Sequence, residues 1–138
     1  MKPVKAVNHV GIAVRSIEAH RPFYETTLGA GFEGFEDVPN QKVRVGIFRI
    51  GDVRIELLEP TDPASTVAAF LEKRGEGLHH VAYTVEGIEE RIAELKRSGL
   101  RMIDEAPRPG AHHTRIAFVH PKSTFGVLTE LCEPAGTK

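Results

Sequence analysis

The chain has 138 residues and a formal net charge of −1, with 41% hydrophobic and 27% charged residues. This composition is typical of one soluble globular domain, and the lack of a basic stripe argues against a nucleic-acid partner. The single cysteine, Cys132, excludes an intrachain disulfide. Because no apolar run approaches membrane-spanning length or resembles a signal segment, we expect a cytoplasmic protein with no membrane contact.

The first half of the chain predicts a strand, a helix and a hairpin. Apolar residues alternate over residues 7–14, which indicates a strand. Ser16 is a plausible N-cap for a helix over about residues 17–28. Residues 43–58 are rich in β-branched side chains around a Gly-Asp turn and predict a hairpin. A short linker helix over about residues 65–73 would lead into the second half.

The second half repeats this order. It predicts a strand over residues 78–85 and a helix over residues 88–98, followed by a short strand at 100–103. The Pro/Gly-rich residues 105–113 are expected to form a loop. A final strand pair is expected at residues 114–120 and 127–131.

Direct sequence similarity supports this repeat. Residues 9–18 return 71 positions later as residues 80–89, and residues 55–60 return 74 positions later as residues 129–134. We therefore expect two βαβββ modules, about residues 5–60 and 77–134, in a single α+β domain. A half-size module cannot easily bury its sheet alone, so the two are expected to pair into a curved, barrel-like mixed sheet around a cavity.

Each copy has a histidine near its start and a glutamate near its end. A pseudo-twofold arrangement would bring together His9, Glu56, His80 and Glu130. Two imidazoles and two carboxylates suit a borderline-to-hard divalent ion such as Co, Ni, Mn, Fe or Zn. Strand alternation places only small residues beside each histidine, which predicts a cavity wall; these residues are Gly11, Ala13, Ala82 and Thr84.

Several other residues require a separate interpretation. Glu59 and Glu133 also repeat, three positions after the candidate ligands, and are expected to be exposed at strand ends. His120 lies in a loop expected to overhang the cavity, where it would either anchor the loop or contact a substrate. Cys132 is expected to be a small buried hydrophobe.

Five stretches carry a family resemblance: residues 9–14, 56–60, 70–80, 104–111 and 120–131. Together they resemble the vicinal-oxygen-chelate superfamily, and within it the methylmalonyl-CoA epimerases. The resemblance extends over nearly the whole chain. It implies paired βαβββ modules, one divalent metal ion (Co, Mn, Ni or Zn), an acyl-CoA substrate and a homodimer. It also implies the metal ligands, which are His9, Glu56, His80 and Glu130.

The chain departs from the family pattern at three places. Some epimerases have a catalytic glutamate where this chain has Val43-Arg44-Val45, so that base is missing. The ligand position at Glu56 is glutamine in some members. A pair of glycines is common where this chain has His112-His113, which changes the expected shape of that loop.

The implied reaction removes the proton α to a thioester and returns it on the other face. Two bases on opposite faces are then needed. The resemblance assigns the first to Glu130, and Glu56 is the candidate for the second, the alternative being that Glu56 only holds the metal. Lys122 and Ser123, together with His120, are expected either to bind the substrate carboxylate or the CoA phosphates or to form a solvated turn. Arg108 is a further candidate for contact with CoA.

Three other activities remain open. A lactoylglutathione lyase of the glyoxalase I type would use the same four ligands on a thiol–aldehyde adduct. A metal-free binding or resistance protein of this fold typically lacks the ligand set. A ring-cleaving dioxygenase would need Fe(II) and usually two histidines with one carboxylate, against which the second glutamate argues.

Overall fold

The computed structural model describes residues 1–135, and it divides into two compact units. The first unit consists of residues 9–79, and the second consists of residues 1–8 together with the chain from His80 onward. Within residues 1–135, no helix is both long and apolar enough to cross a bilayer.

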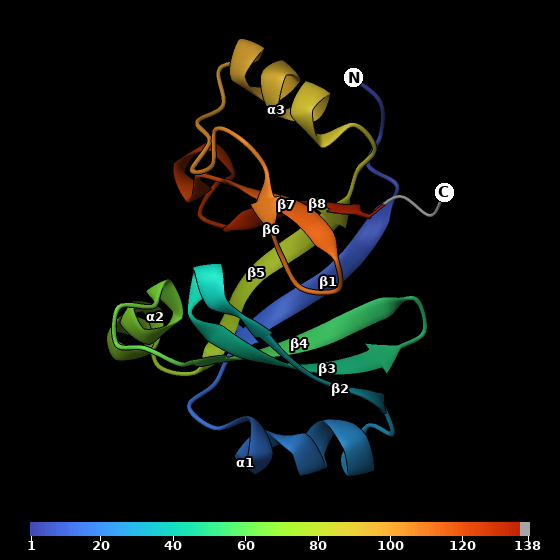
Figure 1. The fold of residues 1–138 in the computed structure, drawn as a ribbon, viewed down its shortest axis with the longest axis vertical. Coiled ribbons are helices and arrows are strands. Elements are labelled where there is room, and N and C mark those ends of the chain that lie inside the picture. The colour runs from blue at the N-terminus through green and yellow to red at the C-terminus, as the bar shows by residue number, and fades with distance from the viewer. Residues whose placement is uncertain (136–138) are drawn as a thin grey trace. The chain divides into compact units, whose positions relative to one another are not determined.

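The first unit contains a mixed four-stranded sheet in the order β2-β3-β4-β1 (Figure 1). Strand β1 runs parallel to β4, whereas β2–β3 and β3–β4 are antiparallel pairs. The strands are β1 (Ala6–Ala13), β2 (Gly31–Val38), β3 (Val43–Ile50) and β4 (Val53–Pro60), where β1 enters this unit at His9. The helical segments are α1 (Ile17–Pro22), η1 (Phe23–Thr27), η2 (Pro39–Gln41) and α2 (Thr66–Arg74).

The single helix expected over residues 17–28 changes its hydrogen-bond pattern halfway. After α1 the chain continues as the π-helical turn η1, in which the Leu28 N–H donates to the Phe23 carbonyl at 2.9 Å. Pro22 lies at the junction and has no N–H to donate, so a regular α-helical ladder cannot run through it.

The second unit contains a four-stranded sheet in the order β5-β8-β7-β6. Strand β5 is parallel to β8, and the β6–β7 and β7–β8 pairs are antiparallel. The elements are β5 (Gly77–Thr84), α3 (Ile88–Arg97), β6 (Arg108–Pro109), β7 (Thr114–Val119), η3 (Pro121–Ser123) and β8 (Thr129–Pro134). The strand expected at 100–103 is reduced to an isolated bridge between Met102 and Val119.

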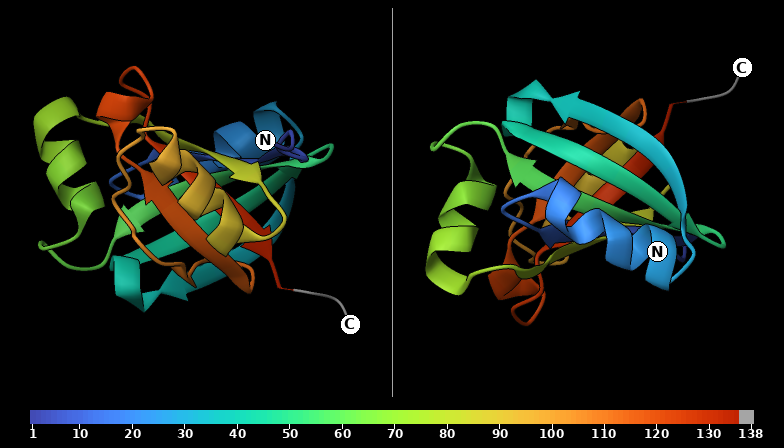
Figure 2. Two further views of the ribbon diagram at one scale, coloured as in Figure 1. Left: turned by 90° about the horizontal axis from the view of Figure 1, so that it is seen from above. Right: turned by 90° about the horizontal axis from the view of Figure 1, so that it is seen from below.

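In each unit the main helix covers one face of its own sheet (Figure 2). Val14 and Ile17 pack with Leu57 in the first unit, and Val85 and Ile88 pack with Leu131 in the second. Both units therefore have the βαβββ order of the α+β class, as predicted. The strand faces turned away from the helices are the ones that carry the candidate ligands.

Candidate active site

The first candidate pair lies on two neighbouring parallel strands. Glu56 on β4 is the register partner of Gly11 on β1, and His9 is two residues before Gly11 on the same face. His9 Nδ1 lies 3.4 Å from Glu56 Oε2, and both side chains are only 6% exposed. Burying a carboxylate is unfavourable unless a positive charge or hydrogen bonds compensate it, and the neighbouring His9 ring nitrogen is one such partner.

The second candidate pair has the same strand geometry. Glu130 on β8 is the register partner of Ala82 on β5, and His80 is two residues before Ala82. His80 Nε2 lies 3.0 Å from Glu130 Oε1, with the side chains 4% and 5% exposed. Each module therefore holds one buried histidine–glutamate pair at equivalent positions of its parallel strands.

The donor chemistry of these pairs fits a divalent metal. Imidazole nitrogens and carboxylate oxygens are ligands that Co, Mn, Ni and Zn accept. Each pair supplies one histidine and one glutamate. Burial favours the same interpretation, because a divalent cation would neutralise carboxylates that water cannot reach.

The His80 side of the second module includes a group that the sequence did not reveal. The Phe118 ring meets the His80 ring edge to face at 5.4 Å between centroids, and the Arg108 guanidinium lies 5.6 Å from the Phe118 ring centroid. Asp104 accepts the Phe118 N–H at 2.8 Å and the Arg108 Nε–H at 3.0 Å. Arg108 is thus held by a carboxylate and an aromatic ring. Asp104 and Arg108 lie in a stretch that carries the family resemblance, but the contacts among Asp104, Arg108 and Phe118 could not be predicted, because none of the three belongs to the similarity between the two halves.

In the second module, one of the small residues expected to line a cavity is packed against other side chains. Ala82 is completely buried and packs with Ile116, Phe118 and Cys132. Cys132 is also fully buried, as expected, and its sulfur lies within 4.8 Å of a carboxylate oxygen of Glu130. Apolar packing therefore fills the part of this face that lies beyond the His80–Glu130 pair.

The three candidate substrate residues lie together around η3. His120 Nδ1 accepts the Lys122 N–H at 3.1 Å, and the Ser123 hydroxyl oxygen accepts the Arg101 N–H at 2.8 Å. Desolvation, followed by the positive charges of Arg101 and Lys122, lowers the pKa of His120. His120 and Ser123 therefore anchor the loop, and Lys122 is an exposed cation.

The expectation that Glu59 and Glu133 are merely exposed strand ends is wrong. Glu59 is half-buried and accepts the Ile17 N–H at 2.9 Å, at the start of α1. Glu133 accepts the Gly87 N–H at 2.6 Å and the Ile88 N–H at 3.5 Å, at the start of α3. Both carboxylates satisfy helix N–H groups that have no partner within the helix.

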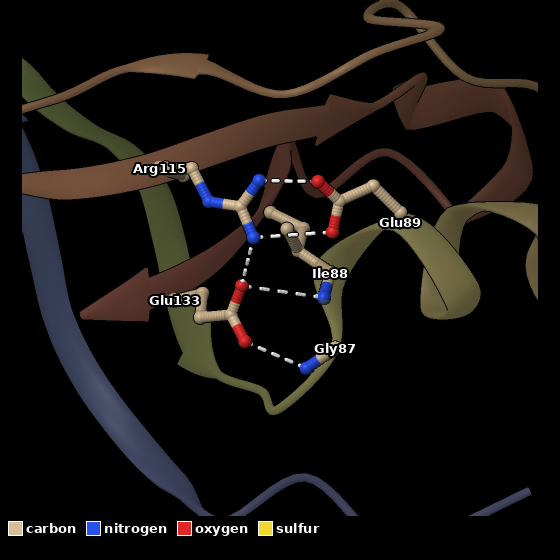
Figure 3. A network of polar contacts seen from close by, with 5 residues as sticks. All are labelled: Gly87, Ile88, Glu89, Arg115 and Glu133. Atoms are coloured by element: carbon tan, nitrogen blue, oxygen red, sulfur yellow. Dashed lines mark hydrogen bonds and ion pairs between the residues drawn. The ribbon is translucent and has the colours of Figure 1, made fainter. Parts of the chain in front are cut away.

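Glu133 belongs to a larger polar network (Figure 3). Arg115 Nη2 donates to Glu133 Oε1 at 2.5 Å, and the same guanidinium contacts Glu89 through both of its terminal nitrogens. Burial opposes ionisation of Glu133, but the hydrogen bonds from Gly87, Arg115 and Ile88 outweigh it and lower the pKa of this carboxyl.

The two other departures from the family pattern have local structural consequences. His112 and His113 have φ angles of 58° and 53°. Their backbone is therefore in the left-handed region, which a pair of glycines would adopt without strain. In β3, Val43 and Val45 are buried, and the Arg44 guanidinium stacks 3.8 Å from the Phe35 ring centroid. β3 itself provides no carboxylate.

Comparisons with known proteins support the sequence resemblance. A family model described as the Glyoxalase/Bleomycin resistance protein/Dioxygenase superfamily matches residues 8–118. An uncharacterized protein of Bacillus subtilis is 47% identical over 130 residues, which are 94% of this chain and 93% of that protein. The ethylmalonyl-CoA/methylmalonyl-CoA epimerase of Cereibacter sphaeroides is 40% identical over 127 residues, covering 91% of this chain and 95% of that protein. A solved structure of a methylmalonyl-CoA epimerase with methylmalonyl-CoA and NH4+ aligns with a TM-score of 0.93 at 34% identity, covering 99% of both chains.

The chain therefore belongs to the glyoxalase/bleomycin resistance protein/dioxygenase superfamily, which is the vicinal-oxygen-chelate superfamily expected from the sequence. The named epimerases among its relatives also confirm the narrower resemblance to the methylmalonyl-CoA epimerases.

Proposed function

We propose that this protein interconverts the (2R) and (2S) epimers of methylmalonyl-CoA. The observation that carries the proposal is the pair of buried histidine–glutamate pairs at equivalent positions of the two modules. Two relatives are named for this epimerisation, one at 40% identity and one as a solved structure with methylmalonyl-CoA. The acyl-CoA thioester is accordingly the substrate class.

In this proposal His9, Glu56, His80 and Glu130 hold one divalent metal ion. Such an ion, when bound, supplies Lewis-acid stabilisation of the negative charge that develops on the thioester oxygen. Glu56 and Glu130 are also buried, which suits them to act as bases, because water does not compete for the proton that is removed from carbon.

The chain's own carboxylates then move the proton. Glu130 removes the proton α to the thioester, and Glu56 returns one on the opposite face, so that the configuration inverts with no net change in atoms. Glu56 takes the second role because β3 has valines and an arginine where some epimerases carry a glutamate. Lys122, with Ser123 and His120 beside it, binds a negatively charged group of the substrate, either its carboxylate or the CoA phosphates.

The test is incubation of the metal-loaded protein with a single epimer of methylmalonyl-CoA in D2O, followed by NMR and chiral analysis. We expect rapid incorporation of one deuterium with loss of configuration, abolished by EDTA. No exchange with Co, Mn or Zn present would refute the activity.

The variant E56Q tests the second base, because glutamine retains an oxygen donor for the metal but cannot transfer a proton. We expect E56Q to exchange the α-proton of one epimer while inversion is lost. Full epimerase activity in E56Q would leave Glu56 as a ligand only. E130Q is the matched variant in the other module, and it should lose exchange of the epimer that E56Q still processes.

A lactoylglutathione lyase of the glyoxalase I type is the second candidate, because the same four donors serve that reaction. The hemithioacetal of glutathione and methylglyoxal is the substrate that separates the two activities. We further propose a cytoplasmic homodimer, which light scattering behind size exclusion and cell fractionation would test.

A further inference from the structure

Phe125 combines two features that do not favour folding. Its side chain is 100% exposed. Its backbone has φ 57°, in the left-handed region that glycine adopts freely and that bulky residues rarely enter. An exposed aromatic ring gains nothing from burial, and a strained backbone that persists is an indication of function.

The loop that carries Phe125, residues 121–128, is held by several hydrogen bonds. The Pro121 carbonyl accepts the N–H of Thr124 at 3.1 Å and that of Gly126 at 2.8 Å. The Val127 carbonyl accepts hydroxyl hydrogen bonds from Thr124 at 2.5 Å and Thr129 at 2.9 Å. The aromatic ring is therefore presented by an ordered turn, which lowers the entropic penalty of binding a ligand there.

Two cationic residues belong to this loop or are bonded to it. Lys122 is three residues before Phe125 and is exposed, and the exposed Arg101 is joined to the loop by the hydrogen bond from its N–H to the Ser123 hydroxyl. The backbone of Arg101 also accepts the His120 N–H at 2.8 Å. Both positive charges lie close enough to His120 to lower the pKa of its imidazole. One cation therefore lies on the loop that carries the exposed aromatic side chain, and a second lies on a residue whose backbone is bonded to that loop.

We propose that Phe125 stacks on the adenine ring of the acyl-CoA substrate while Lys122 and Arg101 bind its phosphates. This inference deepens the proposed function and rests on it, since that function supplies the CoA thioester. The nucleotide of CoA combines a flat aromatic base with several phosphate charges, which is the chemistry that an exposed ring beside two cations recognises. β8, which carries Glu130, begins at Thr129 directly after the loop.

Phe125 and the candidate catalytic residues would contact different ends of the acyl-CoA substrate. The reacting carbon of an acyl-CoA is separated from the adenine by the long pantetheine arm, so different groups must contact the two ends. Phe125 would act on the far end and contribute to substrate affinity rather than to proton transfer. An apolar protein surface is a poorer partner for this loop, because Lys122 and Arg101 would have to lose water without gaining a counter-charge.

The variant F125G separates a binding role from a folding role. Glycine adopts φ 57° without strain, so F125G should unfold at an equal or higher urea concentration than the wild type. With methylmalonyl-CoA we expect its KM to rise about 5- to 20-fold with little change in kcat, from the usual strength of base–aromatic stacking. With the methylmalonyl thioester of pantetheine, which lacks the nucleotide, wild type and F125G should be equal. F125Y keeps an aromatic face and should remain close to wild type.

The outcomes are distinguishable from failure of the proposed function. Equal KM values of wild type and F125G for methylmalonyl-CoA, or equal losses on both thioesters, would overturn the stacking proposal. A wild type inactive on both thioesters would overturn the epimerase function instead. In that case NMR titration with adenosine 3′,5′-bisphosphate still decides the stacking proposal: binding weakened in F125G and in K122Q supports it. Absence of binding to the wild type, or a changed oligomeric state of F125G, refutes it.

Discussion

The two modules begin their helices with different side chains. In the first module, Ser16 accepts the Ala19 N–H at 3.2 Å and Glu59 accepts the Ile17 N–H at 2.9 Å. In the second module the position equivalent to Ser16 is Gly87, which has φ 66° and no side chain. Glu133 therefore provides the side-chain acceptor for the N–H groups of both Gly87 and Ile88. The first module instead combines a strand glutamate with an N-cap serine.

The packing of the helix start on its sheet differs as well. Ile17 contacts Gly46 so closely that a Cβ on Gly46 would lie 2.7 Å from Ile17 Cγ2. In the second module, 71 positions later, Ile88 packs in one cluster with Ala117, where the methyl group is accommodated. The first module is therefore tighter at this contact.

The opposite faces of the two sheets are alike. His9 and His80 stand two residues before the register partners of Glu56 and Glu130, and both pairs are buried. The repeat thus preserves the side chains on the face that carries the candidate ligands. On the face toward the helices, the packing and capping residues differ between the modules. Helix packing can be met by many side chains, but a metal shell requires particular donor atoms at fixed positions.

The largest expected effect tests the equivalence of the two ligand faces. H9A and H80A should each weaken Co(II) binding about 100-fold or more, because each removes one donor from the proposed shell. Calorimetric titration of the metal-free protein measures this directly. H79A is the matched control, because His79 points away from His80 on β5 and its ring contacts Phe70 at 5.0 Å. If only one of the two histidines were required, a metal site shared by both modules would be wrong.

The sequence was sufficient to predict which strand faces carry the candidate ligands, and the reason is physical. A strand alternates with period two, so similar sequences of strand residues in both halves define which side chains share a face. The expectation that His9, Glu56, His80 and Glu130 hold one metal ion together rests on this argument and stays a prediction. The helix α3 and the hairpin β3–β4 were predictable on similar grounds, because their apolar residues recur at helical and strand spacing.

Other features depend on contacts that no local pattern encodes. Strand β2 is at the end of its sheet and begins with a glycine-containing, acidic sequence, so its strand signal is weak; β6 has only two residues. The helix-capping roles of Glu59 and Glu133 arise from residues more than 40 positions apart along the chain. Single repeated glutamates at strand ends cannot be assigned to such caps before the helix start is placed.

The second prediction tests the packing difference between the modules. G46A should lower the free energy of unfolding by about 2 kcal/mol, because the added methyl must displace the β-branched Ile17 side chain. A117G is the matched change in the second module. It should cost about 1 kcal/mol through lost burial and added chain freedom, without a clash. Urea unfolding with EDTA present measures both variants. A neutral G46A would show that Ile17 relaxes and that the two helix starts are packed equally loosely.

The third prediction compares the two capping glutamates. E133A should cost about 2 kcal/mol, because Glu133 accepts from both Gly87 and Ile88 and no neighbouring side chain replaces it. E59A should cost about 1 kcal/mol, since Ser16 still caps α1. The additional variant S16A/E59A should approach the loss seen in E133A. Equal losses for the two single variants would mean that the network around Arg115 adds nothing to the cap.

The smallest expected effect is a difference in pH dependence. The pKa of Glu133 is below its ordinary value in the folded protein, because its hydrogen bonds outweigh the opposing effect of burial. The unfolded chain therefore binds the proton more readily, and the stability that Glu133 contributes is fully present above about pH 4.5 and is lost as the pH falls below it. In E133Q the amide oxygen still accepts a hydrogen bond but cannot titrate, so its unfolding free energy should fall less steeply between about pH 5 and pH 3. Urea unfolding across this range, with EDTA throughout, measures the slope.

E89Q is the control from the same network: Arg115 also lowers the pKa of Glu89, but this carboxylate is exposed and solvent screens it, so the slope should change less than in E133Q. Parallel curves for wild type and E133Q would show that the carboxylate of Glu133 caps α3 no better than a neutral amide.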